Sequence, residues 1–210
     1  MNHRTAVSSQ MRGFLRDRGL VFPASLANTR KRIPQLLEDG ENDLTPMARE
    51  TLAELYDFLR EIDHRIAVFD QRIEAVFRAS SDAQRIAHIE GVGPKIATAV
   101  IAAVADGREF CNGRHMAAWL GLVPRQHSSG DRVQLMGITK RGDQHLRTLI
   151  VHGARAVVHT AAKKTDPKSQ WVNELKQRRG FNKAVVAVAN KNARTIWAVL
   201  RRGDEYRKAA

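Results

Sequence analysis

The most regular pattern of apolar and polar positions in the chain begins after Thr45 and Pro46. Apolar side chains then recur at alternating spacings of three and four over about 25 residues, with charged residues on the other faces: Leu52, Leu55, Leu59, Ile62, Ile66, Phe69, Ile73 and Val76. Threonine suits a helix N-cap, and proline suits the first helical position. The pattern predicts one long helix, which either forms a coiled-coil dimer or hairpin or packs as an ordinary amphipathic helix in a bundle.

Shorter helical patterns lie on either side of this helix. Before it, Gly19 and two prolines interrupt basic helical pieces. After it, apolar periodicity predicts helices at 112–120, 143–160, 171–179 and 182–202, and a weak alternation predicts a short β-hairpin within 132–140. The predicted fold class is therefore mainly α. Its expected segments are a basic helical N-terminal region over 1–44, a coiled-coil helix over 45–80 and a helical domain over 81–210.

A glycine-rich turn, Gly91-Val92-Gly93-Pro94-Lys95, opens the last of these segments. A helix that ends at Gly91 and a second helix that starts at Gly93-Pro94 resemble a helix-hairpin-helix motif. In such a motif, unpaired backbone N–H groups at the start of the second helix hold a DNA phosphate. We therefore expect Gly91, Gly93 and Lys95 to bind phosphate, and the alternative is a plain turn between two helices.

Charge separates the two halves of the chain more sharply than its net value of +13 suggests. Residues 107–210 contain about 21 Lys and Arg but only about 7 Asp and Glu, whereas residues 1–106 are close to neutral. Such asymmetry is typical of a region that binds a polyanion, most often nucleic acid. The basic residues do not alternate with an exposed aromatic face, so a role at a membrane surface fits less well. The second half is predicted to bind DNA or RNA in a salt-sensitive way.

Two adjacent serines, Ser128 and Ser129, precede Gly130 in a loop between residues 119 and 147. Five cations lie close to these serines in sequence: Arg125, Arg132, Lys140, Arg141 and Arg147. A hydroxyl nucleophile among fixed cations is what attack on a phosphodiester requires, because the cations offset the charge that develops during displacement. We expect Ser128 or Ser129 to be catalytic and Arg125, Lys140, Arg141 and Arg147 to hold phosphate oxygens. The alternative is a Ser-Gly turn on a basic surface.

Several motifs together resemble the insertion sequence 110 family of bacterial transposases, including its 116 and 902 branches. The resemblance extends over essentially the whole chain and rests on four stretches: Gly91 to Pro94, Trp119 to Gly130, Gly137 to Asp143 with Leu146 and Arg147, and Ala187 to Lys191 with Arg194 and Trp197. Residues 1–78 resemble the end of the family's N-terminal portion and its coiled-coil insertion. Residues 86–202 resemble its C-terminal transposase domain.

The resemblance implies DNA recombination that moves a mobile element. It implies that a serine, matching Ser128 or Ser129 and more closely Ser128, becomes covalently linked to DNA during strand cleavage and exchange. It also implies an N-terminal resolvase-like domain with four carboxylates that bind divalent metal, and a structured guide RNA encoded by the element. The stretch that would carry those carboxylates would precede His3, and the first acidic residue here is Asp17. We therefore expect a truncated copy, a fragment or a late-start translation of a transposase gene, without metal ligands of its own, since Mg²⁺ would belong to the absent domain.

Three functions remain open at this stage. The first is a transposase or recombinase with a serine nucleophile, for which His127 is the neighbouring candidate base. The second is a truncated, non-catalytic protein that binds DNA or guide RNA and inhibits intact copies; a basic RNA chaperone is a third reading that rests on charge alone. DNA, guide RNA and a second copy of the chain are the expected partners. A single cysteine, Cys111, and the absence of a long apolar run indicate a cytoplasmic protein that is not bound to a membrane.

Overall fold

The computed structural model describes residues 2–129 and 132–206, so Gly130 of the predicted serine loop lies outside the described residues. The chain divides into two units, Met1–Arg72 and Ile73–Ala210, each with its own buried core. Nearly all of the described secondary structure is helical, and the one sheet among these residues has two short strands. The predicted class, mainly α with at most a short hairpin, is confirmed.

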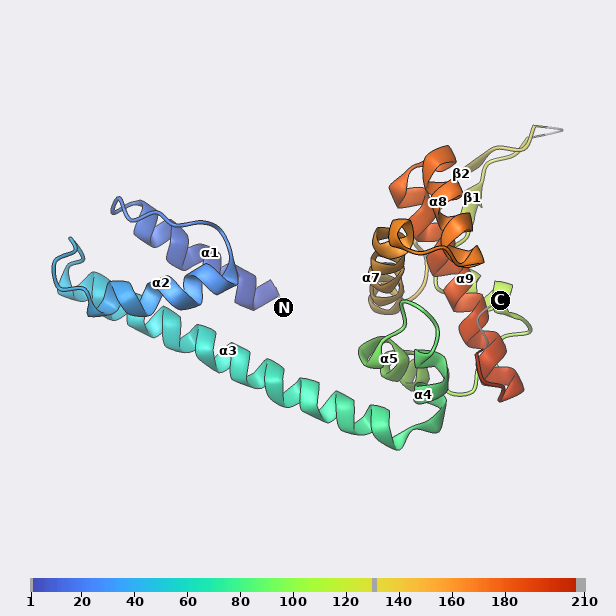
Figure 1. Ribbon diagram of the computed structural model, residues 1–210, viewed down its shortest axis with the longest axis horizontal. Helices are drawn as coiled ribbons and strands as arrows, with labels where there is room; N and C mark the ends of the chain where they lie inside the picture. Colours follow the sequence, from blue (N-terminus) through green and yellow to red (C-terminus); the bar gives the residue numbers. More distant parts are fainter. Residues whose placement is uncertain (1, 130–131, 207–210) are drawn as a thin grey trace. The chain divides into compact units, whose positions relative to one another are not determined.

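The first unit consists of three helices, α1 (Asn2–Arg16), α2 (Leu26–Glu38) and the first part of α3 (Pro46–Ala79). Figure 1 shows α1 and α2 beside the start of α3. Ser25 caps α2 by accepting a hydrogen bond from the backbone N–H of Asn28, and the buried hydroxyls of Ser8 and Thr29 lie 2.9 Å apart between α1 and α2. The core is aliphatic: Val7, Met11, Leu15, Ile33, Leu44, Ala48, Leu52 and Leu59.

Helix α3 is the long helix that the apolar seam predicts. Leu52 and Leu59, in the first half of the seam, are fully buried in the core of their own unit. This half therefore packs within the chain, as the bundle interpretation predicts. The second half differs, because Phe69 and Val76 are each 59% exposed.

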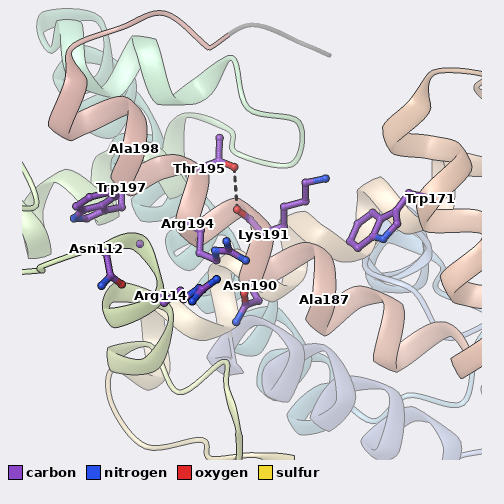
Figure 2. Close-up of a pocket in the computed structure, with 11 residues that line it drawn as sticks. Asn112, Arg114, Trp171, Ala187, Asn190, Lys191, Arg194, Thr195, Trp197 and Ala198 are labelled. Carbon is purple, nitrogen blue, oxygen red and sulfur yellow. Dashed lines mark hydrogen bonds between the residues drawn. The ribbon is translucent and has the colours of Figure 1, made fainter. Parts of the chain in front are cut away.

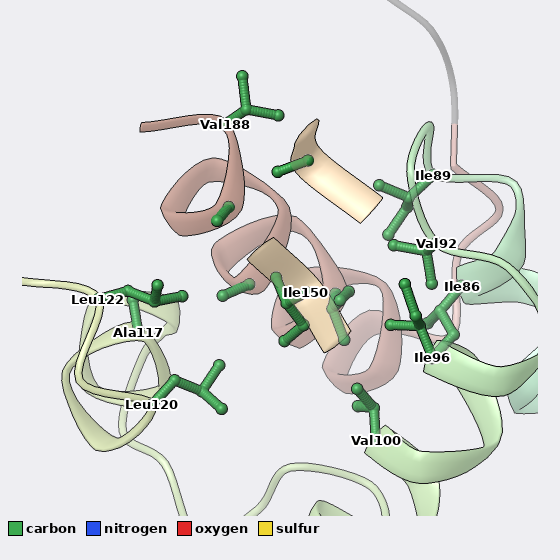
Figure 3. Packing of buried hydrophobic residues seen from close by; sticks show 14 of the residues in the cluster. Ile86, Ile89, Val92, Ile96, Val100, Ala117, Leu120, Leu122, Ile150 and Val188 are labelled. Atoms are coloured by element: carbon green, nitrogen blue, oxygen red, sulfur yellow. The ribbon is translucent and has the colours of Figure 1, made fainter. Parts of the chain in front are cut away.

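The second unit is arranged around α9 (Phe181–Arg202), which packs against α7 (Gln144–Thr160), α6 (Gly113–Trp119), α8 (Pro167–Arg179) and α4 (Ser81–Ala87). Its other elements are α5 (Pro94–Val104), the strands β1 (Pro124–Gln126) and β2 (Leu135–Ile138), and the short 3-10 helix η1 (Ala161–Lys163). Figure 3 shows the aliphatic packing around α9, where Ile150 of α7 lies among residues from α5, α6 and α9. Ile196 and Val188 of α9 are completely buried in this core.

The hairpin and the caps show how well local signals locate the elements. Asp143 caps α7 and Asn112 caps α6, as helices at 143–160 and 112–120 predict. The hairpin is present, but its extent was predicted incorrectly: β2 at 135–138 lies inside the expected range, and β1 at 124–126 lies upstream of it. The two strands are antiparallel, with Pro124 opposite Ile138 and Gln126 opposite Leu135.

Candidate nucleic-acid interface

The two candidate serines lie beyond the last strand pair of the hairpin, and both are exposed. The hydroxyl of Ser128 accepts a hydrogen bond of 3.0 Å from the side-chain amide of Gln126. Ser129 and Arg132 exchange two backbone hydrogen bonds, of 3.3 and 3.2 Å, across the hairpin. The hydroxyls are therefore open to a large ligand, and the backbone of Arg132 lies directly opposite Ser129.

Lys140 and Arg141 follow β2 at the opposite end of the hairpin, its base. The backbone N–H of Lys140 donates to the carbonyl of Gly121, which places both exposed cations where the hairpin leaves the helical core. Ser128 is four positions along the chain from Pro124, which pairs at the base, so the two ends are about 13 Å apart at about 3.3 Å per residue. Arg147 is also at the base, where its guanidinium donates 3.2 Å to the carbonyl of Leu120.

The structure thus brings some of the predicted site residues together and separates others. Arg125 lies in β1, three positions before Ser128, and is exposed, and Arg132 lies opposite Ser129. Lys140, Arg141 and Arg147 line up at the base instead of surrounding the hydroxyls. Cationic side chains are therefore distributed from the base of the hairpin towards its tip. Such a distribution suits binding of an extended polyanion.

In the glycine turn between α4 and α5, Gly91 packs against another helix and Gly93 lies at the surface. The backbone of Gly91, with a φ of +86°, lies so close to Gly153 of α7 that a side chain on either residue would collide with the other's backbone. Around Gly93, by contrast, no atom lies within 4 Å of the point where a Cβ would stand, and Lys95 is exposed. Of the three predicted phosphate ligands, Gly91 therefore lies where the turn meets α7, while Gly93 and Lys95 face outward at the start of α5.

Glu90 in the same turn links it to the beginning of α8. Its carboxylate, 14% exposed, lies 3.0 Å from the ammonium of Lys164 and 3.6 Å from that of Lys168. Burial lowers the pKa of Lys168 below its ordinary value, while the charge of Glu90 acts in the opposite direction. Asn192 of α9 also donates 2.9 Å to the carbonyl of Glu90, so the turn is held from two helices.

A groove of about 810 Å³ runs along the exposed side of α9, and the sequence prediction missed it. Figure 2 shows Arg114 of α6 beside Arg194 and Asn190 of α9, with Lys191 directed towards Trp171 of α8. These residues lie up to 80 positions apart, so no local pattern links them. Trp197 also lines the groove, and its indole N–H donates to the carbonyls of Gly107 and Phe110, at 3.2 and 3.1 Å.

Two other kinds of site can be assessed within the described ranges. Over residues 2–129 and 132–206, no three His, Cys, Asp or Glu side chains gather as a metal ion would require. No helix in the part of the chain that the structure describes is both long and apolar enough to cross a bilayer.

Comparison with known proteins shows that the chain is similar to bacterial transposases. Residues 83–170 match the family model described as Transposase IS116/IS110/IS902 family. The chain is 45% identical over 205 residues to a Pseudomonas aeruginosa protein named "Probable family 20 transposase", and these residues cover 97% of the chain and 61% of the relative. It is 43% identical over 207 residues to the transposase for insertion sequence element IS1111A of Coxiella burnetii, covering 99% and 57%.

A more distant relative carries a different kind of name. The pilin gene-inverting protein of Moraxella bovis is 26% identical over 154 residues, covering 72% of the chain and 46% of that protein. The chain thus spans about 60% of the length of the two more similar relatives.

Proposed function

Since the chain belongs to the IS116/IS110/IS902 family of transposases, we propose that it acts on DNA in the recombination that moves an insertion sequence. The observation that carries this proposal is the overlap of the matched transposase domain, residues 83–170, with the basic half of the chain, residues 107–210. Phosphate contacts by those cations would position DNA without reading its sequence. A structured guide RNA is the second polyanion that this half would bind, and we propose it as a further partner.

We propose that Ser128 or Ser129 is the nucleophile. Its hydroxyl oxygen would attack a backbone phosphorus, the bond to one DNA oxygen would break, and that oxygen would leave with a proton as a free hydroxyl. Arg125 and Arg132 are the cations closest along the hairpin to neutralise the phosphate oxygens, and Lys140 and Arg141 would hold the strand nearer the base. Gly93 and Lys95 at the start of α5 are proposed to hold a further phosphate.

A serine hydroxyl also needs a base. The amide of Gln126, which donates to Ser128, cannot accept its proton, and among the described residues the imidazole of His127 makes no hydrogen bond to either serine. We therefore propose that the base joins the site only when DNA is bound. No step is assigned to Mg²⁺, because the described residues offer no cluster of carboxylates.

The hydrogen bond between Gln126 and Ser128 favours a second candidate function. A hydroxyl paired with an amide donor, on an exposed hairpin, suits a protein that binds DNA or guide RNA without cutting it. Such a protein would occupy element ends or sequester the guide and so inhibit intact copies.

Covalent trapping separates the two functions. The full chain would be incubated with suicide DNA, in which a nick lets the cleaved end diffuse away, and then denatured and separated by size. A serine recombinase is expected to give a slower-migrating protein–DNA species that survives denaturation and disappears on nuclease treatment. Binding without that species, with and without Mg²⁺, would support the non-catalytic function.

We further propose that the exposed second half of the α3 seam pairs with the same segment of another copy. Phe69 and Val76 continue the three-four apolar seam that Leu52 and Leu59 begin, and both are exposed, so an apolar stripe continues beyond the core of the first unit. Ion pairs such as Glu74 with Arg78, 3.1 Å apart, flank the stripe as they do in paired helices.

Changing Phe69 and Val76 to lysine is expected to convert a dimer into a monomer, because two charges would enter the paired seam. Light scattering at micromolar concentration should then report 23.5 kDa instead of twice that mass. The matched control is Met47→Lys, since Met47 is 77% exposed and lies outside the seam. A parent chain that is already monomeric would contradict the pairing.

A further inference from the structure

The groove along α9 is lined by three cationic side chains that do not belong to the serine hairpin. Arg114, Lys191 and Arg194 line it, and no carboxylate is among its lining residues. None of the ion pairs found in the described ranges involves these three side chains. Like charges that line one groove without a counter-charge favour an anionic ligand.

The two guanidinium groups are brought together by the backbone. A Cβ on Gly113 would lie 2.9 Å from the carbonyl oxygen of Arg194 and 3.0 Å from its Cα, so α6 and α9 touch there with no side chain between them. Arg114, the next residue, is thereby fixed beside Arg194, as Figure 2 shows. Two forked donors held side by side match the non-bridging oxygens of phosphate groups.

An aromatic face lies at the other end of the groove. The ammonium of Lys191 is 4.6 Å from the ring centroid of Trp171, which is half-buried against the core. Trp197 cannot move to serve as a platform, because two backbone carbonyls hold its indole N–H. Trp171 is therefore the aromatic ring in the groove on which a base could stack, by displacing the ammonium of Lys191.

We propose that this groove binds an unpaired nucleic-acid strand, with its phosphates on Arg114 and Arg194 and a base against Trp171. This inference rests on the proposed function only in that the chain binds nucleic acid. A cationic groove with an aromatic platform is the arrangement that single-strand binding requires. A duplex cannot use it in the same way, because its bases are stacked on one another.

The groove also leads to the hairpin. Asn190 lines both this groove and the adjacent depression formed by Pro124, Leu135 and Lys140. Its side-chain amide donates 3.2 Å to the carbonyl of Leu122, just before β1 begins. A strand that passes Asn190 therefore reaches Lys140 at the hairpin base, and the groove guides one strand towards the serines.

The test is fluorescence anisotropy of the full chain with three labelled probes: a single-stranded DNA, an RNA of the same sequence and the DNA duplex. Arg114→Gln with Arg194→Gln is expected to weaken single-strand binding by about 10-fold and to reduce the slope of log affinity against log salt by about 1.4, as loss of two phosphate contacts predicts. The control, Arg178→Gln with Arg179→Gln, removes the same charge from exposed positions at the end of α8 and should leave that slope near the parent value.

Trp171 gives an independent readout. Trp171→Leu keeps an apolar side chain against the core but removes the aromatic face, so single-strand affinity should fall about 10-fold while duplex affinity stays unchanged. Trp171→Phe should restore most of the loss, and thermal melting would verify that all variants fold.

The outcomes separate this inference from the proposed function. The groove proposal would be wrong if the groove and control variants lost single-strand affinity equally. It would also be wrong if Trp171→Leu weakened binding to single strands and to the duplex equally. Either result would leave the proposal of nucleic-acid binding intact. A parent chain that binds none of the probes would contradict both. The relative affinities for DNA and RNA would identify which strand the groove holds.

Discussion

A chain in which Ser128 and Ser129 are both alanine is expected to form no covalent adduct with suicide DNA. Alanine removes the attacking oxygen, and loss of a serine nucleophile lowers the rate of its reaction on the order of 10³-fold or more. DNA affinity should stay close to that of the parent, because both side chains are exposed and neither carries charge. The measurement is denaturing electrophoresis of the trapped species beside an affinity titration.

The single variants would assign the nucleophile. We expect Ser128→Ala to abolish the adduct and Ser129→Ala to retain it, and the reverse result would assign Ser129. Ser81→Ala, an exposed serine at the start of α4, is the matched control and should trap DNA as the parent does. An adduct that persists in the double variant would show that the attacking group lies elsewhere.

Replacing Gly153 by alanine is expected to destabilise the second unit by about 3 kcal/mol. The new methyl group would overlap the carbonyl oxygen of Gly91 and would lie 2.8 Å from Cδ1 of Ile96. Neither the backbone of the turn nor the packed isoleucine can move far, because Ile96 is in the core and Asn192 holds the neighbouring carbonyl of Glu90. Helix α7 and the α4–α5 turn would have to separate.

Tryptophan fluorescence during denaturant unfolding would measure this loss, because Trp119, Trp171 and Trp197 all lie in the second unit. The control is Gly137→Ala, since no atom lies within 4 Å of the added carbon there. An unchanged unfolding midpoint for Gly153→Ala would contradict the close packing of Gly91 against α7.

Much of the helical fold could be predicted from the sequence because its signals are local. The N-caps Asn112 and Asp143 lie within three residues of the N–H groups they accept from, and the apolar spacing of α3 and α9 is visible in a single window. The family could also be recognised from the sequence, because its motifs are contiguous, and the resemblance is confirmed. The upstream strand of the hairpin was missed because Pro124 to Gln126 has no clear alternation of its own and pairs only with β2.

The candidate site was less predictable because it depends on which distant side chains meet. Arg147 and Ser128 are only 19 positions apart, yet Arg147 is tied to Leu120 at the hairpin base. Arg114 and Arg194 are 80 positions apart, yet a glycine contact places them side by side. Gly91 has the spacing of a phosphate-binding turn, and its backbone lies directly against Gly153 of α7. The sequence shows that the hairpin and its surroundings are cationic. It does not show which of the cations lie near the serines and which lie at the hairpin base.

The salt dependence of DNA binding tests the central claim most directly: that the cations of the second unit neutralise a nucleic-acid backbone. We predict that the affinity of the full chain for a DNA duplex falls by about 10³-fold between 50 and 200 mM salt, as expected for about six phosphate contacts. An affinity that stays constant over that range would contradict the claim.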